Sequence, residues 1–332
     1  MAVQADRRLL VSAIVGCAYF MYALDSTIIA TALPQMALSL GVNPVRLSIV
    51  IIAYVVSMAV FVPVSGWLAD QFGACRIFAA AIAVFTLGSL FCGLSNNILE
   101  LAAARVLQGA GGAMVLPVGR LVILRSVPKS GFVKAMAMLG LFPTVGSMLG
   151  PVVGGFITTY ASWRWIFLIN IPIGVIGIIL VLLFVENFRG DERRPLDGVG
   201  FALTGLSLAC VMYSFEAIGR GGSELAPSLL LLAVGVVSGV LAVRHVRIHP
   251  NPLLDLSLLR IPTLRKNITG GSLFRVTTGG ISFLLPLLFQ VVFGLTAFAS
   301  GGLTVALAGG VLSVRLIVQW LLRSLGFRVA LV

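Results

Sequence analysis

The chain has 332 residues, of which 59% are hydrophobic and only 10% are charged. Soluble domains carry about 25% charged residues, so this composition excludes an ordinary soluble protein and predicts one that lipid surrounds. The net charge of +12 could suggest nucleic-acid binding, but no basic face with interleaved aromatic residues accompanies it.

Ten apolar segments are long enough to cross a hydrocarbon core of about 30 Å, which takes about 20 helical residues. The connections between them are short, so the predicted fold class is an all-α membrane protein of about ten transmembrane helices. The segments cover residues 9–32, 46–69, 77–95, 97–119, 133–159, 165–185, 199–218, 227–246, 267–293 and 298–321.

The first segment follows Arg7 and Arg8 and could be read as a signal peptide. Its length, the polar Asp25 within it and the further apolar segments favour a retained helix instead. Most of the 23 lysines and arginines fall in alternate connections, beginning with the N-terminus. Because such residues collect in cytoplasmic loops, we expect a cytoplasmic N-terminus, and membrane orientation accounts for the +12.

Two opposite charges stand inside the predicted spans. The first segment enters from the inside near Leu9, so a rise of 1.5 Å per residue places Asp25 about 24 Å from the inner surface, in the outer third of the membrane. The fourth segment enters from the outside near Asn97, which places Arg105 about 12 Å below the outer surface. The two depths are similar, so the side chains can pair. The pair is either a proton-titratable switch or a static link between two helices, and intramembrane carboxylates are rare enough to favour the switch.

The fifth segment is rich in glycine, reading GLFPTVGSMLGPVVGG over residues 140–155. Gly146, Gly150 and Gly154 recur every four residues and predict close contact with a neighbouring helix. Pro151 removes a backbone donor and predicts a bend. Ordinary helix packing is the alternative reading, although the combination with Pro151 and Gly155 is less common than a lone glycine pair.

A polar turn, GWLADQFGACR, separates the second and third segments. It holds Gly66, Asp70, Gly73 and Arg76. Asp70 stands at a cytoplasmic helix end, where it can cap neighbouring helix termini or pair with Arg76.

The placement of the cysteine and histidine residues argues against a disulfide framework or a metal site. The four cysteines are scattered, and His245 and His249 lie together before Pro250. Their four-residue spacing could bind a metal on a helix, but Pro250 follows at once. We therefore interpret these histidines as part of a solvated basic loop, and expect neither metal nor cofactor. No GxxxxGK[ST] loop is present, which favours a proton gradient over ATP as the energy source.

These elements together resemble the major facilitator superfamily, and more narrowly its 14-helix drug:proton antiporters. LDSTIIATALP is similar to that branch's first-helix motif, GWLADQFG to the loop after the second helix, and SWRWIFLINIPIG to the entry into the sixth. RVLQGAGGAMVLP resembles the fourth-helix motif and GSMLGPVVGG the antiporter motif of the fifth helix. The fourth-helix motif contains Arg105, Gln108, Gly109 and Gly112.

The resemblance implies roles for these residues. Asp25 would take part in proton coupling, Arg105 would relay its charge, and the fifth-helix motif would seal the cytosolic leak path. The loop after the second helix would help to gate the inner side, although Ala74 and Cys75 replace the basic residues usual there, leaving only Arg76.

The resemblance also implies a division of the chain. Residues 1–188 would form a six-helix bundle, 189–250 a two-helix insert, and 251–332 a partial second half that stops four helices short. A weak internal echo supports this, since LLRSLGFR late in the chain is similar to LADQFGACR.

The function implied is export of small lipophilic compounds by proton antiport, in a bacterial plasma membrane. An inactive, truncated remnant is one alternative. A membrane-embedded enzyme is another, disfavoured because no catalytic groups cluster in the spans. Expected partners are the small-molecule substrate, protons and the lipid bilayer, with a periplasmic adaptor if the cell is Gram-negative, and no nucleic acid.

Overall fold

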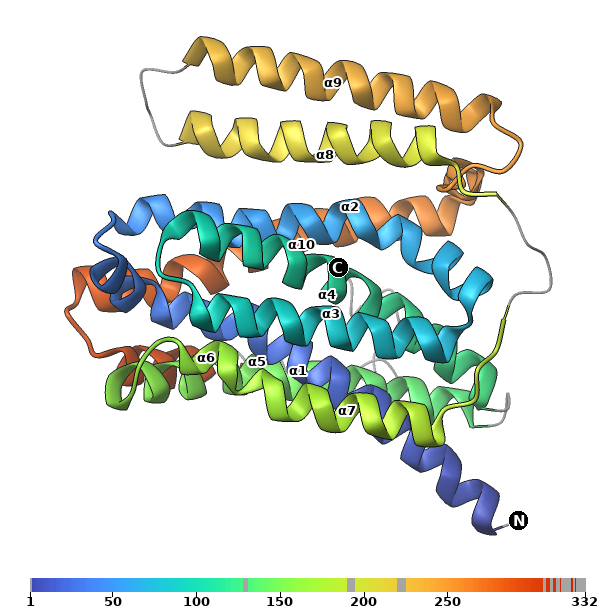
Figure 1. Ribbon diagram of the computed structural model, residues 1–332, viewed down its shortest axis with the longest axis horizontal. Coiled ribbons are helices and arrows are strands. Elements are labelled where there is room, and N and C mark those ends of the chain that lie inside the picture. The colour runs from blue at the N-terminus through green and yellow to red at the C-terminus, as the bar shows by residue number, and fades with distance from the viewer. Residues whose placement is uncertain are drawn as a thin grey trace.

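The computed structural model describes residues 2–127, 131–189, 195–219 and 225–306, together with 309, 310, 313, 314, 317, 324 and 326. Within these residues the regular structure is helical and contains no strand. The helices run roughly along one common direction, as a membrane bundle requires (Figure 1).

Nine spans in the described ranges are long and apolar enough to cross a membrane. They match the first nine predicted segments. The tenth, 298–321, falls largely outside the described residues, where the short apolar helix Ala297–Ala306 marks its beginning. The helices are α1 (Ala2–Leu40), α2 (Ser48–Phe72), α3 (Ala74–Leu94), α4 (Ile98–Ser126), α5 (Phe132–Tyr160), α6 (Trp165–Leu168), α7 (Asn170–Phe184), α8 (Gly198–Gly219), α9 (Leu225–Ile248) and α10 (Pro262–Leu287), with 3₁₀ turns at Pro44–Leu47 and Leu256–Arg260 and a π-turn η3 (Leu288–Val292).

The first seven helices form one packed bundle. Helix α1 packs along α5, while α4 lies between α2 and α3, and α7 covers α3 (Figure 1). Two buried apolar clusters fill its interior, one containing Phe78 and Phe85 and the other Trp163 and Phe167. Asp25 lies on α1 in the interval between the two clusters, so apolar packing above and below isolates its carboxylate.

Glycines let the helices around α4 approach closely. A Cβ at Gly109 would lie 2.6 Å from the Tyr54 carbonyl oxygen on α2, and one at Gly88 of α3 would lie 2.5 Å from the Gln108 nitrogen. Real Cβ atoms do not approach so closely. The two glycines therefore allow the backbones of α2 and α3 to pack closely against that of α4 near Gln108.

The predicted segment 165–185 forms one span but is broken into α6 and α7 at Ile169. Pro172 has no amide hydrogen to donate to the carbonyl of Leu168, which explains the interruption. Asn170 stands at this break.

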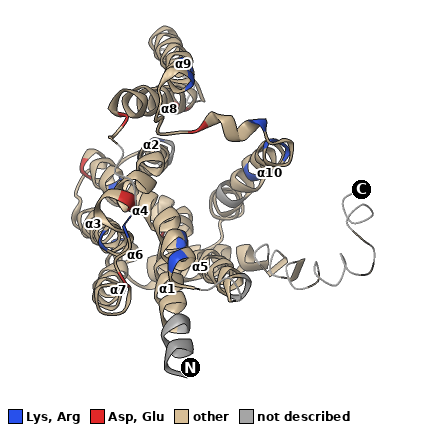
Figure 2. Cartoon of the chain, turned by 90° about the vertical axis from the view of Figure 1, so that its right-hand side faces the viewer, with Lys and Arg blue, Asp and Glu red and all other residues tan. Residues whose placement is uncertain are grey.

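The remaining described helices lie beside the bundle. Helices α8 and α9 form a hairpin, and α8 packs against α2 (Figure 1). Seen end-on, α10 lies apart from α8 and α9 (Figure 2). Within the bundle it contacts α1.

Candidate functional site

Asp25 and Arg105 form an ion pair within the seven-helix bundle. Arg105 Nη1 lies 3.0 Å from Asp25 Oδ2, and the two side chains are 1% and 0% exposed. Arg105 is placed by the start of α4, where the Asn97 side chain accepts a hydrogen bond from the Glu100 amide. This cap fixes the helix register about 12 Å from Arg105. The structure thus brings together the two residues that sequence analysis placed at similar depth.

Two amides complete the network around Asp25. Gln108 Nε2 and Asn170 Nδ2 each donate to Asp25 Oδ1 at 2.9 Å. Arg105 Nη1 also donates to Gln108 Oε1 at 2.7 Å, and Asn170 donates to Ser89 Oγ at 3.0 Å. The carboxylate therefore accepts three hydrogen bonds, which together offset the cost of holding a charge in hydrocarbon.

Tyr54 forms the wall of this network. Its ring lies under the Arg105 guanidinium, whose Cζ is 4.0 Å from the ring centroid. Gly112 faces the Tyr54 hydroxyl, because a Cβ there would lie 3.1 Å from it. Among the described residues, Tyr54 OH, Arg105 Nε and Asn170 Oδ1 are buried polar atoms that find no hydrogen-bond partner. These atoms retain hydrogen-bonding capacity around the ion pair.

The loop after α2 is organised differently from the sequence expectation. Asp70 pairs with Arg125 at the end of α4, at 3.2 Å, and not with Arg76. The backbone amide of Arg76 instead donates to Asn187 Oδ1 at 3.4 Å. Gly73 adopts φ +99°, a conformation that L side chains rarely adopt, so it makes the sharp turn into α3. Gly66 is exposed, with no atom within 4 Å of an added Cβ.

The glycines of the fifth segment face α1. A Cβ at Gly146 would lie 2.6 Å from the Phe20 carbonyl oxygen, and one at Gly154 would lie 2.7 Å from that of Ile28. A Cβ at Gly150 would overlap the Thr27 side chain. An adjoining face meets the helix Ala297–Ala306.

On that adjoining face, a Cβ at Gly155 would overlap the backbone of Ala297, and one at Gly301 would overlap the carbonyl of Pro151. Helix α5 is therefore held closely on two sides.

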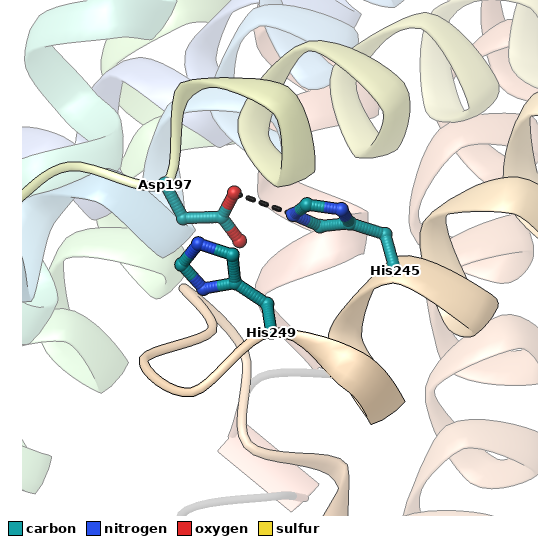
Figure 3. Close-up of side chains that lie close together, drawn as sticks. All are labelled: Asp197, His245 and His249. Carbon is teal, nitrogen blue, oxygen red and sulfur yellow. Dashed lines mark hydrogen bonds and ion pairs between the residues drawn. The ribbon is translucent and has the colours of Figure 1, made fainter.

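Asp197, His245 and His249 gather at one end of the α8–α9 hairpin (Figure 3). His245 is in the last turn of α9, so the expectation that both histidines lie in a solvated loop is wrong for His245. Its Nε2 lies 2.7 Å from Asp197 Oδ1. The sequence clue to Asp197 is its place before Gly198, because Asp197 caps α8 by accepting from the Gly200 amide at 2.8 Å.

The Asp197 carboxyl is held in its charged form. Burial raises its pKa, but hydrogen bonds from the Gly200 amide, His245 and the Leu253 amide outweigh burial, and the net pKa lies below the ordinary value. A polar cavity of about 910 Å³ adjoins this carboxylate. Its lining includes Asp70, Arg125, Asp197, His249 and Asp255.

An apolar cavity of about 830 Å³ lies between the first two helices and α10. Leu33 of α1 and Leu284, Leu288 and Val292 of the α10–η3 segment contribute apolar walls. Asn43 and Ser48 are its polar lining residues.

Sequence analysis identified Asp25, Arg105 and Gln108 but missed Tyr54, Asn170 and Arg125. Asn170 carried a usable signal, since it is a polar residue within a strongly apolar span. The ring of Tyr54 and the position of Arg125 depend on how the helices pack and left no such signal.

Comparison with known proteins agrees with this architecture. The chain is 42% identical over 321 residues to "Putative multidrug resistance protein MdtD" of Escherichia coli (strain K12), covering 96% of this chain and 68% of that protein. Among solved structures it resembles the POT family transporter PepTSo, with a TM-score of 0.53 and 16% identity, covering 87% of this chain and 68% of that one. It also matches a bacterial homologue of the human lysosomal transporter Spinster, with a TM-score of 0.47 and 16% identity, covering 71% of this chain and 60% of that one. The profile of the Major Facilitator Superfamily matches residues 15–332. This multi-pass membrane chain of packed apolar helices therefore belongs to the Major Facilitator Superfamily, whose members are transporters.

Proposed function

We propose that the protein exports small lipophilic compounds in exchange for protons, across a bacterial plasma membrane with the N-terminus inside. The observation that carries this proposal is the buried network of Asp25, Arg105, Gln108 and Asn170. A carboxylate at this depth is costly, and a titratable group is what proton coupling requires.

Protonation of Asp25 would change the network in a definite way. The neutral carboxyl no longer balances the Arg105 guanidinium, which keeps contacts to Gln108 Oε1 at 2.7 Å and to the Tyr54 ring at 4.0 Å. The helices α1 and α4 are then tied less strongly. A proton thereby biases the balance between two arrangements of the bundle, and this bias is the physical content of coupling.

Two observations support the proposed substrate class, namely the apolar cavity and the similarity to a relative named as a multidrug resistance protein. Ligand sites are mostly apolar with a few polar groups that fix orientation, as in the cavity between Leu33 and the α10–η3 segment. Its walls come from helices in two parts of the chain. We divide these parts as 1–188 and 251–332, with 189–250 as a two-helix insert. A site between two parts that move relative to one another suits alternating access.

Two further elements support the same mechanism. We assign the Asp70–Arg125 pair, together with Gly66, Gly73 and Arg76, to the inner gate. The close contacts of Gly146, Gly150 and Gly154 with α1, and of Pro151 and Gly155 with the helix Ala297–Ala306, would seal the path to the cytosol.

The test is efflux of preloaded ethidium from energised cells that lack their own exporters. We expect the wild type to export the dye and a protonophore to stop it. Asp25→Asn should abolish export while its membrane content stays at the wild-type level. Glu100→Gln, a matched change at the exposed outer end of α4, should export normally.

Unchanged export by Asp25→Asn would remove the proton-coupling assignment. If cells that express the wild type retain as much dye as empty-vector cells, the result would instead favour the transport-inactive alternative.

A further inference from the structure

A second cluster of ionisable side chains lies far along the sequence from the Asp25 network. It consists of Asp197 before α8, His245 in the last turn of α9 and His249 just beyond that helix (Figure 3). One metal-ligating atom from each residue lies within 4.8 Å of the other two. Nothing in the proposed transport mechanism uses these three residues.

The chemistry of the cluster matches a transition-metal site. Two imidazoles and one carboxylate are a donor set used for zinc, with Zn–N distances of about 2.0–2.1 Å and Zn–O distances of about 2.0–2.2 Å. Ligand atoms on one tetrahedral ion are then about 3.3 Å apart. The present spacing therefore needs only small side-chain rotations, and His249 is half-exposed and lies past the helix end.

The orientation of the donors is already set by surrounding groups. His245 directs Nε2 at the Asp197 carboxylate. His249 Nδ1 accepts from the Asn251 amide at 3.3 Å, so a metal ion at Nε2 requires the ring proton to move to Nδ1 and this contact to open. The Asp197 oxygens accept from the amides of Gly200 and Leu253, at 2.8 and 3.4 Å. Such supporting hydrogen bonds orient ligands and raise metal affinity.

The cluster is also accessible to an ion. Asp197 is itself buried, but the polar cavity of about 910 Å³ reaches it and is lined by His249 as well. An entry path and deprotonated ligands are the conditions that a metal site must satisfy.

We propose that Asp197, His245 and His249 bind one first-row transition-metal ion of the Zn²⁺ type, with water completing its coordination. The ion replaces the direct hydrogen bond between Asp197 and His245. It fastens the N-terminal end of α8 to the C-terminal end of α9, and so stiffens the hairpin beside the Asp70–Arg125 pair.

The test uses the full chain, purified in detergent without a polyhistidine tag, and titrated with Zn²⁺ by calorimetry and with Co²⁺ by visible absorption. We expect one ion per chain, a Co²⁺ spectrum of a low-symmetry site, and a melting temperature that Zn²⁺ raises. His249→Ala and His245→Gln should each weaken binding at least about tenfold and remove the Zn²⁺-dependent rise.

Asp255→Asn is the matched control, because Asp255 lines the same cavity outside the cluster, and it should bind like the wild type. Metal-free His249→Ala should melt like the metal-free wild type, which separates loss of a ligand from loss of the fold. Equal binding by the wild type and both histidine variants, or no binding by the wild type, would overturn the proposal. The cluster would then serve only as a hydrogen-bonded contact between Asp197 and His245.

Discussion

Asn170 Nδ2 lies 2.9 Å from Asp25 Oδ1, although 145 residues separate the two along the chain. The same nitrogen lies 3.0 Å from Ser89 Oγ. One amide thus links α1, α3 and α7 at the level of the buried ion pair. Its position at the break between α6 and α7 makes this contact possible.

Replacing Asn170 with alanine should destabilise the protein measurably. A hydrogen bond to a charged group is worth about 1.5–3 kcal/mol, and we expect a loss of that size. The measurement is denaturant unfolding of the purified protein in detergent. Asn96→Ala, in the exposed turn before α4, should stay within about 0.5 kcal/mol of the wild type. Equal stability of both variants would show that the Asn170 amide contributes nothing.

A double-mutant cycle should reveal strong coupling between Asp25 and Arg105. Arg105→Met leaves a buried carboxylate without its cation, which costs about 3–5 kcal/mol. Adding Asp25→Asn removes the stranded charge, so the double variant should be more stable than Arg105→Met alone. Denaturant unfolding of all four proteins measures the coupling. Additive losses would contradict the ion pair, and Arg46→Met at an exposed site should change stability little.

Adding a methyl group at Gly146 should push α1 and α5 apart. The new Cβ would lie 2.6 Å from the Phe20 carbonyl oxygen, which belongs to the backbone and cannot move alone. We expect Gly146→Ala to cost about 1–3 kcal/mol, the usual range for overpacking. Gly279→Ala is the control, since no atom lies within 4 Å of its added Cβ. That variant should gain stability through helix propensity, by about 0.5–1 kcal/mol. A thermal melt in which the two variants agree would argue against close α1–α5 packing.

Breaking the Asp70–Arg125 pair should alter transport more than stability. Both side chains are partly exposed, and pairs of this kind contribute about 0–1 kcal/mol. We therefore expect Asp70→Asn and Arg125→Gln to melt within a few degrees of the wild type but to slow ethidium efflux. The double variant should be no slower than either single variant, because both changes remove the same contact. Multiplicative slowing would place the two residues in separate roles.

Much of the fold could be predicted because helices that cross a membrane need long apolar runs, which are visible in the sequence. Segment 97–119 carries Asn97 at its cap and Arg105 two turns later, so the depth of Arg105 followed from counting residues. The close contact of the glycine face Gly146–Gly154 could likewise be anticipated from its four-residue spacing, although its partner, α1, could not.

The missed residues share a physical cause. Asn170 reaches Asp25 only because a break at Ile169 turns the chain, and that break depends on Pro172 within an otherwise continuous apolar run. Asp70 pairs with Arg125 because packing brings the ends of α2 and α4 together, a contact that the spacing within one turn does not reveal. Asp197 contacts His245 because α8 and α9 fold back on one another as a hairpin. A pairing across 48 residues produces no periodic pattern in the sequence that could predict it.

The network at Asp25 also sets an order of events during synthesis. Arg105 follows Asp25 by 80 residues, so at about 5–20 residues per second the ribosome delivers the cation about 4–16 s after the acid. Asn170 arrives later still. The first helix is therefore complete before either partner of its acid has been synthesised. The charge of Asp25 can be balanced only after α4, which carries Arg105, has been synthesised.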